Sequence, residues 1–205
     1  PGRLTVTYSA QHADGSRLKE APSEVTLVTR EATNRLTASQ IGLNVLLLAL
    51  GTVAIRPFSK DDLRGVPIEE AGDRAHLRNP VPTAFVRSLQ AAVDARVEQE
   101  ADWRTRTFHR PLMVGGGWAA LVYDTLVGTD DPGYQISLKL DVYKQPETGW
   151  LASTRRVECS GQSEPPRPMA YWAQAGHAAV QEQLALLLAA CQDKVVVDLP
   201  RLLQE

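Results

Sequence analysis

The sequence predicts a single α+β domain over residues 1–205, with a mainly antiparallel sheet and two or three helices packed on one face. Three observations predict it. Residues 134–143 alternate apolar and polar side chains without a break, which is typical of a half-buried strand. Residues 83–101 and 169–192 repeat apolar residues at helical spacing. No internal repeat is evident, and 205 residues suffice for one sizeable core.

Composition narrows the class of protein. Apolar residues make up 43% of the chain and charged residues 22%, which is ordinary for a folded domain and too apolar for a disordered one. The net charge of −2 lacks the basic excess of a dedicated nucleic-acid binder, so we expect no nucleic-acid partner. It also gives no electrostatic attraction to anionic membrane surfaces.

Two short alternating stretches open the chain. Residues 4–8 and 24–29 both read as half-buried strands, and residues 13–16 between them supply turn chemistry. We expect the two strands to pair with each other.

An unbroken run of 20 residues without a charge, Leu36–Ile55, follows between Arg35 and Arg56. As a helix it would be about 30 Å long, roughly one bilayer core. Ser39 and Pro57 suit the start and stop of an apolar helix over about residues 40–55.

Three roles for this run remain open: a core helix, a membrane contact, or a packing surface for a partner. Gln40, Asn44 and two glycines make it a poor isolated transmembrane helix, which favours core packing. If residues 36–56 instead form an excursion from the core, its apolar side chains are the candidates for membrane or partner contact. These are Leu43, Leu46, Leu47, Leu50 and Val53.

Charged residues and prolines then predict a solvated connector over residues 57–82, with a short helix near residues 68–77. A helix is expected over residues 83–101, with Pro82 near its first turn. Gly115–Gly117 would be a flexible lead into a strand at residues 118–127.

The clearest strand, residues 134–143, returns through a turn at residues 146–149 to a partner strand at residues 150–159. Together with the strand at 118–127 this predicts three consecutive antiparallel strands. A long helix over 169–192 and a short final strand at Val195–Val197 complete the chain.

The two cysteines, Cys159 and Cys191, allow one intramolecular pairing. In an oxidising compartment they would form a disulfide that restricts the unfolded chain. In a reducing cytosol they would be two small buried hydrophobic residues.

No motif predicts a catalytic, metal or cofactor site. Gly115–Gly117 lacks the spacing of a phosphate loop or a dinucleotide fingerprint. The four histidines have no zinc-binding spacing, and the aspartates at 124, 130 and 131 suit a turn better than a calcium loop. The two carboxylates of each adjacent pair, Asp61–Asp62 and Glu69–Glu70, do not lie on one helix face. For an exported chain, a disulfide between Cys159 and Cys191 explains Cys159 better than a reactive thiol does. We therefore expect a protein that is not an enzyme and carries no cofactor.

Four consecutive features resemble a known family pattern. They are an alternating strand, the Thr148-Gly149-Trp150 turn, a returning strand and an Ala/Leu-rich helix. Over residues 118–199 the chain is similar to small bacterial envelope lipoproteins with an α/β fold like the N-terminal domain of TolB, including the curli-secretion channel lipoprotein. Here the Trp follows the Gly directly, which departs from the family spacing. The resemblance implies a periplasmic lipoprotein, lipidated upstream of Pro1, and no functional residue is carried over from it.

These observations lead to the hypothesis of a non-enzymatic assembly or accessory component of a bacterial cell-envelope complex, in the periplasm or on the periplasmic side of the outer membrane. Its expected partners are proteins of that complex, a second copy of the chain, and a membrane through residues 36–55. The alternative is a soluble module that binds a small apolar ligand between the helices and the sheet.

Overall fold

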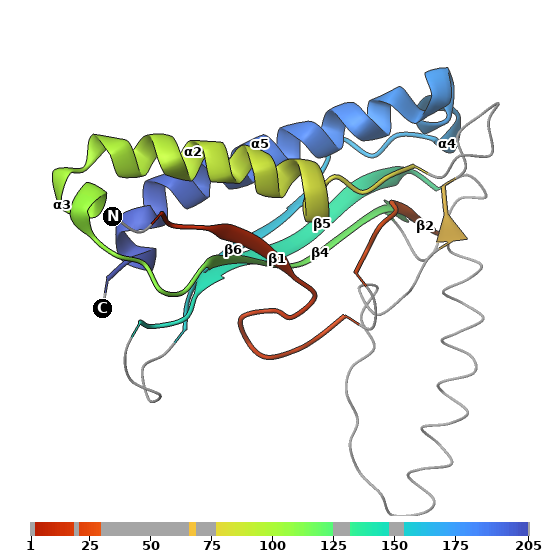
Figure 1. Cartoon of the computed structure of the whole chain (residues 1–205). Helices are drawn as coiled ribbons and strands as arrows, with labels where there is room; N and C mark the ends of the chain where they lie inside the picture. Colours follow the sequence, from red (N-terminus) through yellow and green to blue (C-terminus); the bar gives the residue numbers. More distant parts are fainter. Residues whose placement is uncertain are drawn as a thin grey trace, which may run out of the picture.

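A six-stranded mixed sheet organises the chain (Figure 1). The computed structural model describes residues 3–18, 21–29, 66–68, 77–124, 132–147 and 154–204. The strand order is β3-β2-β4-β5-β6, and β1 also pairs with β4. The strands are β1 (Val6–Ser9), β2 (Thr26–Val28), β3 (Val66–Pro67), β4 (Leu112–Tyr123), β5 (Tyr134–Lys144) and β6 (Arg155–Gln162).

The centre of the sheet is the antiparallel meander of β4, β5 and β6. The predicted strand at residues 134–143 is confirmed as β5, one residue longer. The predicted partner strand at 150–159 is shifted, because β6 spans Arg155–Gln162. The strand expected at 118–127 starts earlier, since β4 begins at Leu112 and runs through the three glycines.

The two N-terminal strands do not pair with each other as expected. Both lie parallel to β4: Val6 of β1 is opposite Leu112, and Leu27 of β2 is opposite Leu121. The physical reason is length. β4 has 12 residues, so the short β1 and β2 find partners along its two halves instead of in each other.

The region predicted as a solvated connector contributes to the sheet. β3 pairs antiparallel with β2, and the backbone N–H of Ile68 donates to Val25 O (3.2 Å). The N–H of Leu77 donates in turn to Ile68 O (2.9 Å). Ile68 and Leu77 are both buried, so this part of the connector belongs to the core. The middle of the short helix expected near 68–77 lies outside the described residues.

Helices cover one face of the sheet, so the predicted α+β architecture is confirmed (Figure 1). The helix expected at 83–101 is present as a π-helical turn and two α-helices. The helical elements are η2 (Val81–Phe85), α2 (Val86–Gln99), α3 (Ala101–Thr105), α4 (Met169–Trp172), η3 (Gln174–His177) and α5 (Ala178–Leu202).

The long C-terminal helix differs from expectation at both ends. It does not begin at residue 169, because Ala175, Gly176 and His177 adopt left-handed backbone angles and separate α4 from α5. At the other end, the predicted strand Val195–Val197 is wrong, since α5 continues to Leu202. Val195 is fully buried on the same helix stripe as Leu199, and this burial outweighs the β-propensity of the valines.

The hydrophobic core lies between the sheet and the two long helices. The even-numbered residues of β5 share one face, and their apolar members from Tyr134 to Val142 are all buried in this core. On α5 the buried stripe recurs at helical spacing: Val180, Leu184, Leu188, Cys191, Val195, Leu199 and Leu202.

The apolar helix expected at about 40–55, with the candidate contacts at 43, 46, 47, 50 and 53, lies outside the described residues. Among the helices that the structure describes, none is both long enough and apolar enough to cross a membrane.

Candidate functional site: an apolar groove between two helices

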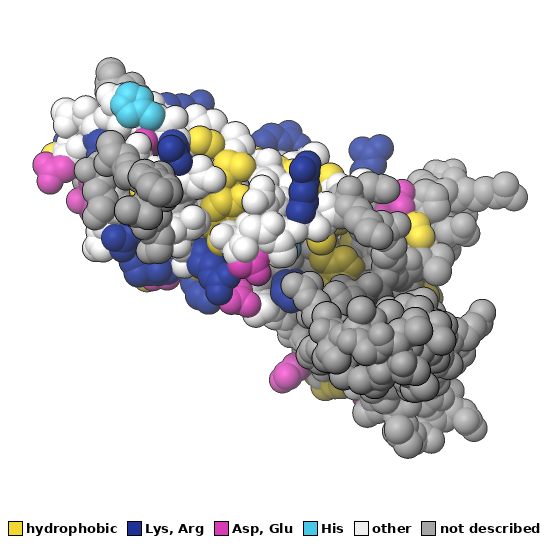
Figure 2. Space-filling view, turned by 90° about the horizontal axis from the view of Figure 1, so that it is seen from below, with side chains coloured by type: hydrophobic (Ala, Val, Ile, Leu, Met, Phe, Trp, Pro, Cys, Tyr) yellow, Lys and Arg dark blue, Asp and Glu magenta, His cyan; other side chains and the backbone are white. Residues whose placement is uncertain are grey.

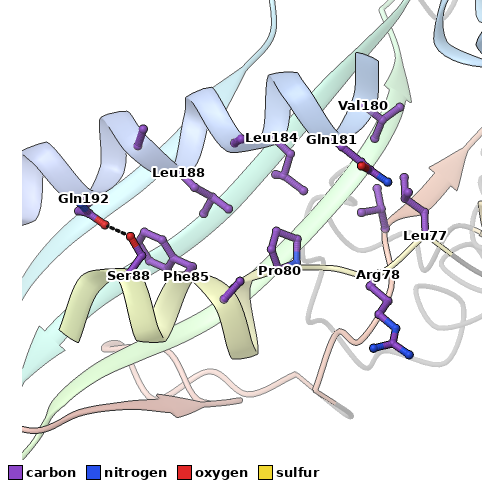
Figure 3. Close-up of a pocket in the computed structure, with 14 residues that line it drawn as sticks. Leu77, Arg78, Pro80, Phe85, Ser88, Val180, Gln181, Leu184, Leu188 and Gln192 are labelled. Carbon is purple, nitrogen blue, oxygen red and sulfur yellow. Dashed lines mark hydrogen bonds between the residues drawn. The ribbon is translucent and has the colours of Figure 1, made fainter. Parts of the chain in front are cut away.

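A groove of about 420 Å³ lies between two helical segments (Figure 3). One side is formed by η2 and the first turn of α2, and the other by the first half of α5. Its floor is apolar and belongs to the hydrophobic core. The buried side chains that line it are Val25, Leu77, Phe85, Val180, Leu184 and Leu188.

Small side chains on the facing sides of the helices create the groove. Ala84 on η2 and Ala185 and Ala189 on α5 line it and are exposed. Two helices pack at 8–10 Å depending on the side chains between them, and alanines cannot fill the space that larger residues would occupy. The sequence therefore leaves a hollow over an otherwise closed core.

The two ends of the groove have different chemistry. At one end Ser88 Oγ donates to Gln192 Oε1 (2.6 Å) and ties α2 to α5 (Figure 3). At the other end lie Gln181 and the exposed Arg78, which is the only charged side chain among the described residues that line the groove. The groove is thus an apolar channel that is closed by a hydrogen bond at one end, and at the other end the guanidinium of Arg78 points away from it (Figure 3).

A second cluster lies on the opposite face of the sheet, where the loop of residues 10–18 crosses β5. His12 Nδ1 lies 2.9 Å from Asp141 Oδ1, and Ala13 N–H donates to Asp141 Oδ2 (2.7 Å). The hydroxyl of Tyr143 donates to Gln11 O (3.1 Å). Asp141 is 4% exposed, so these bonds satisfy a carboxylate held away from water.

The ionisation of this cluster follows from its contacts. The hydrogen bond to Asp141 raises the pKa of His12 above its usual value, although burial of the ring opposes the shift. Burial raises the pKa of Tyr8 to about 12, and its hydroxyl donates to Gly116 O (2.7 Å). Both groups fasten the N-terminal segment to β4 and β5.

Gly115–Gly117 is a bulge inside β4 and not the flexible lead that the sequence suggested. Gly116 has φ +74° and a Cβ there would lie 2.0 Å from the His12 ring. Gly117 has φ +89° and faces Val81 of η2. The three glycines let the loop approach β4 on one face and η2 on the other, so they serve close packing.

The disulfide predicted as one alternative is present. Cys159 of β6 and Cys191 of α5 are joined with their Cα atoms 5.5 Å apart, and both residues are buried. The bond links the edge strand to the helix that covers it. Lys194 Nζ and Arg201 Nη2 of α5 reinforce that link by donating to the carbonyls of Glu158 (2.7 Å) and Arg156 (2.8 Å).

The remaining candidates are dispersed. His109 donates its backbone N–H to Glu147, which follows β5, and His177 is the N-cap residue of α5. Asp124 lies at the end of β4. The other residues considered as ligands or carboxylate pairs lie outside the described residues: Asp61, Asp62, Glu69, Glu70, His76, Asp130 and Asp131.

Sequence reasoning missed both the groove and the His12–Asp141 pair. No sequence pattern marks Ala185 and Ala189 of α5, and only the fold shows that they line a groove beside α2. His12 and Asp141 are 129 positions apart, and no local pattern links them. The sequence offers one signal, a charged residue, Asp141, at a polar position of the alternating stretch that forms β5. Its place opposite Gly115 of β4 is known only from the sheet register.

Seen from below in Figure 2, the sheet face that carries this cluster shows hydrophobic patches interspersed with Lys and Arg side chains, and a few acidic ones beside them. The basic residues are spread along the face that the structure describes and do not gather at one place. The groove on the helix side is therefore the more distinctive candidate site.

No protein-family model, curated protein or solved structure matches this chain. The resemblance of residues 118–199 to envelope lipoproteins stays a prediction.

Proposed function

We propose that this chain is a non-enzymatic assembly or accessory component of a bacterial cell envelope, located on the periplasmic side. The observation that carries the proposal is the buried Cys159–Cys191 disulfide between β6 and α5. Such bonds form and persist in oxidising compartments and are rare in a reducing cytosol.

The position of the uncharged run supports the same proposal. Residues 36–55 fall between β2 and β3, which pair antiparallel with Leu27 opposite Val66. The run is therefore inserted between two neighbouring strands at one edge of the sheet, while the described residues supply a core of their own. This placement favours a contact segment, through which the domain would meet a membrane or a partner.

The Leu47→Asp variant tests the contact segment. We expect the purified variant to keep the thermal midpoint and near-UV circular dichroism of the parent. It should lose flotation with vesicles of phosphatidylethanolamine and phosphatidylglycerol, or lose assembly measured by light scattering. Leu186→Asp is the matched control, because Leu186 is 58% exposed on α5 and the change should affect neither property. An unfolded Leu47→Asp monomer would place the run in the core and contradict the proposal.

Compartment is tested separately on protein isolated from its own cells. Non-reducing mass spectrometry should find the Cys159–Cys191 linkage in nearly all molecules. Two free thiols would contradict a periplasmic location.

A second candidate function is a binding module for a small apolar ligand, and the groove favours it. Its volume of about 420 Å³ lies in the range of small-molecule pockets, and its floor is apolar with a few polar groups at the ends. Native mass spectrometry of gently purified protein should then retain an adduct of one small molecule per chain. Protein that arrives free of any adduct and binds no added apolar compound contradicts this function.

A further inference from the structure

β6 is the last strand of the sheet, and its outer side has no strand beside it among the described residues. Its register with β5 shows which backbone groups lie on that side. The N–H of Ser163 donates to Ile136 O (2.9 Å), and in an antiparallel pair only alternate residues bond to the partner strand. The other alternate set therefore points its N–H and C=O groups outward: Arg156, Glu158, Ser160 and Gln162. Such a row is a template for the addition of another strand.

Two cations of α5 close the first half of this outer edge. Lys194 Nζ donates to Glu158 O (2.7 Å), and Arg201 Nη2 donates to Arg156 O (2.8 Å). The two cations lie about two turns apart on one face of the helix. Both side chains are exposed, so they can leave the edge without opening the core. Long charged side chains at an edge strand hinder the addition of a further strand.

The charges on β6 favour one register for pairing with a second copy of the chain. Two identical antiparallel strands are related by a twofold axis and contribute the same surface. With that axis at Val157, Arg156 of each copy lies opposite Glu158 of the other. Both side chains are exposed on one face of β6, so opposite charges meet across the pair. An axis at Glu158 would place two glutamates opposite each other, and an axis at Cys159 would pair neither charge with its opposite.

We propose that the outer edge of β6 is a pairing surface for a second copy of this chain, and that Lys194 and Arg201 hold it closed in the monomer. The register in which the charges match uses the outward groups of Arg156 and Glu158. These are the residues whose carbonyls the two cations occupy. Because both copies use the same strand, association ends at a dimer. The surface is independent of residues 36–55.

The first test removes the two cations by Lys194→Ala with Arg201→Ala and measures the dimer dissociation constant of the full chain by sedimentation velocity. It should fall by about tenfold or more, because the outward carbonyls are then open to a strand of the second copy. Each single substitution keeps one of the two bonds and should give an intermediate value. The matched control is Arg87→Ala with Arg104→Ala, which removes the same charge from exposed positions of α2 and α3. Near-UV circular dichroism checks that each variant is folded.

The second test examines the register in the chain that lacks both cations. Arg156→Glu places like charges opposite each other and should weaken the dimer, whereas the swap of Arg156→Glu with Glu158→Arg should restore it. Hydrogen exchange should slow at the outward amides of residues 156 and 158 when the dimer forms. Loss of pairing in the swapped variant would contradict the register with its axis at Val157.

Three results would overturn the proposal. Equal dissociation constants in the parent and the cation-free variant would mean that Lys194 and Arg201 do not close the edge. A dimer without added protection of residues 155–162 would place the contact elsewhere. Aggregates that grow beyond two copies would contradict pairing about a twofold axis.

Discussion

The two faces of β5 are held by different interactions. On the helix face, Leu138, Leu140 and Val142 are buried in a continuous apolar core beneath α5. On the other face, Asp141 and Tyr143 are equally buried, at 4% and 5%, yet they are polar and bond to a loop. Burial alone therefore does not distinguish the faces; the type of contact does.

This difference predicts how each face fails. Apolar contacts are not directional, so the helix face should tolerate small shifts and depend on total area and on its covalent link. The loop face depends on a few hydrogen bonds whose loss leaves a buried carboxylate or N–H group unpaired. The stability lost in a substitution on the loop face should therefore depend on which hydrogen bond it removes.

The largest effect is expected on the helix face, from removal of the disulfide by Cys159→Ala with Cys191→Ala. The bond closes a loop of 32 residues, and restriction of the unfolded chain by such a loop stabilises a protein by about 3–4 kcal/mol. Urea unfolding should show that loss in the free energy of unfolding. Treatment of the parent with a reductant should reproduce it, and a loss below about 1 kcal/mol would mean that packing alone holds α5 to β6.

A smaller loss is expected on the loop face, from Gly116→Ala. Its positive φ costs an alanine about 1 kcal/mol, and the new Cβ would displace the His12 ring from Asp141. Together these effects should lower the free energy of unfolding by about 2–3 kcal/mol.

Gly15→Ala is the matched control for that variant. Gly15 also has a positive φ, +86°, but no atom lies within 4 Å of its added Cβ. It should show only the backbone cost of about 1 kcal/mol. Equal losses in the two alanine variants would mean that the approach of His12 to the bulge adds nothing to stability.

The same contrast explains what could be predicted from the sequence. The alternation in β5 and the helical spacing in α2 and α5 arise because each element buries one face. That pattern is contained in a short stretch of sequence, so it predicts all three elements. The count of two cysteines limited the chain to one possible intramolecular disulfide, Cys159–Cys191, and left free buried thiols as the alternative. The groove itself could not be predicted, because it depends on how α2 and α5 pack.

The failures have physical causes as well. Val195–Val197 has the composition of a strand, but the helix stripe that continues to Leu199 and Leu202 fixes it as part of α5. Gly115–Gly117 has the composition of a flexible segment, but contacts from His12 and Val81 on its two faces require glycine at that place in β4. In both cases a tertiary contact overrides a local preference.

A third variant, Asp141→Ala, removes the acceptor for His12 and for the Ala13 N–H group. Hydrogen bonds to a charged group contribute about 1.5–3 kcal/mol, and the half-buried loop can regain part of this from water, so a loss of about 2 kcal/mol is expected. Hydrogen exchange should show faster exchange of the loop amides at residues 12–16, while α5 keeps its protection. Equal acceleration in α5 would contradict independent behaviour of the two faces.

The smallest effect is a pH dependence confined to the loop face. The pKa of His12 is raised in the folded chain, chiefly by its hydrogen bond to Asp141, with a further contribution from Asp14. Tyr8 and Tyr143 also face this loop, and Lys139 of β5 opposes the shift. Since the folded chain binds the His12 proton more tightly than the unfolded chain, His12 adds stability that is fully present below a pH of about 6.5 and is lost as the pH rises through the folded pKa.

Urea unfolding of the parent and of His12→Gln, measured from about pH 5.5 to about pH 8.5, tests this dependence. The free-energy difference between the two proteins should shrink as the pH rises. The two cysteines that link α5 to β6 contribute no such change, because they do not titrate while they are bonded. A difference that stays constant over the whole range would mean that His12 holds the loop as a neutral hydrogen-bond donor, and the contrast between the faces would then be one of geometry and not of charge.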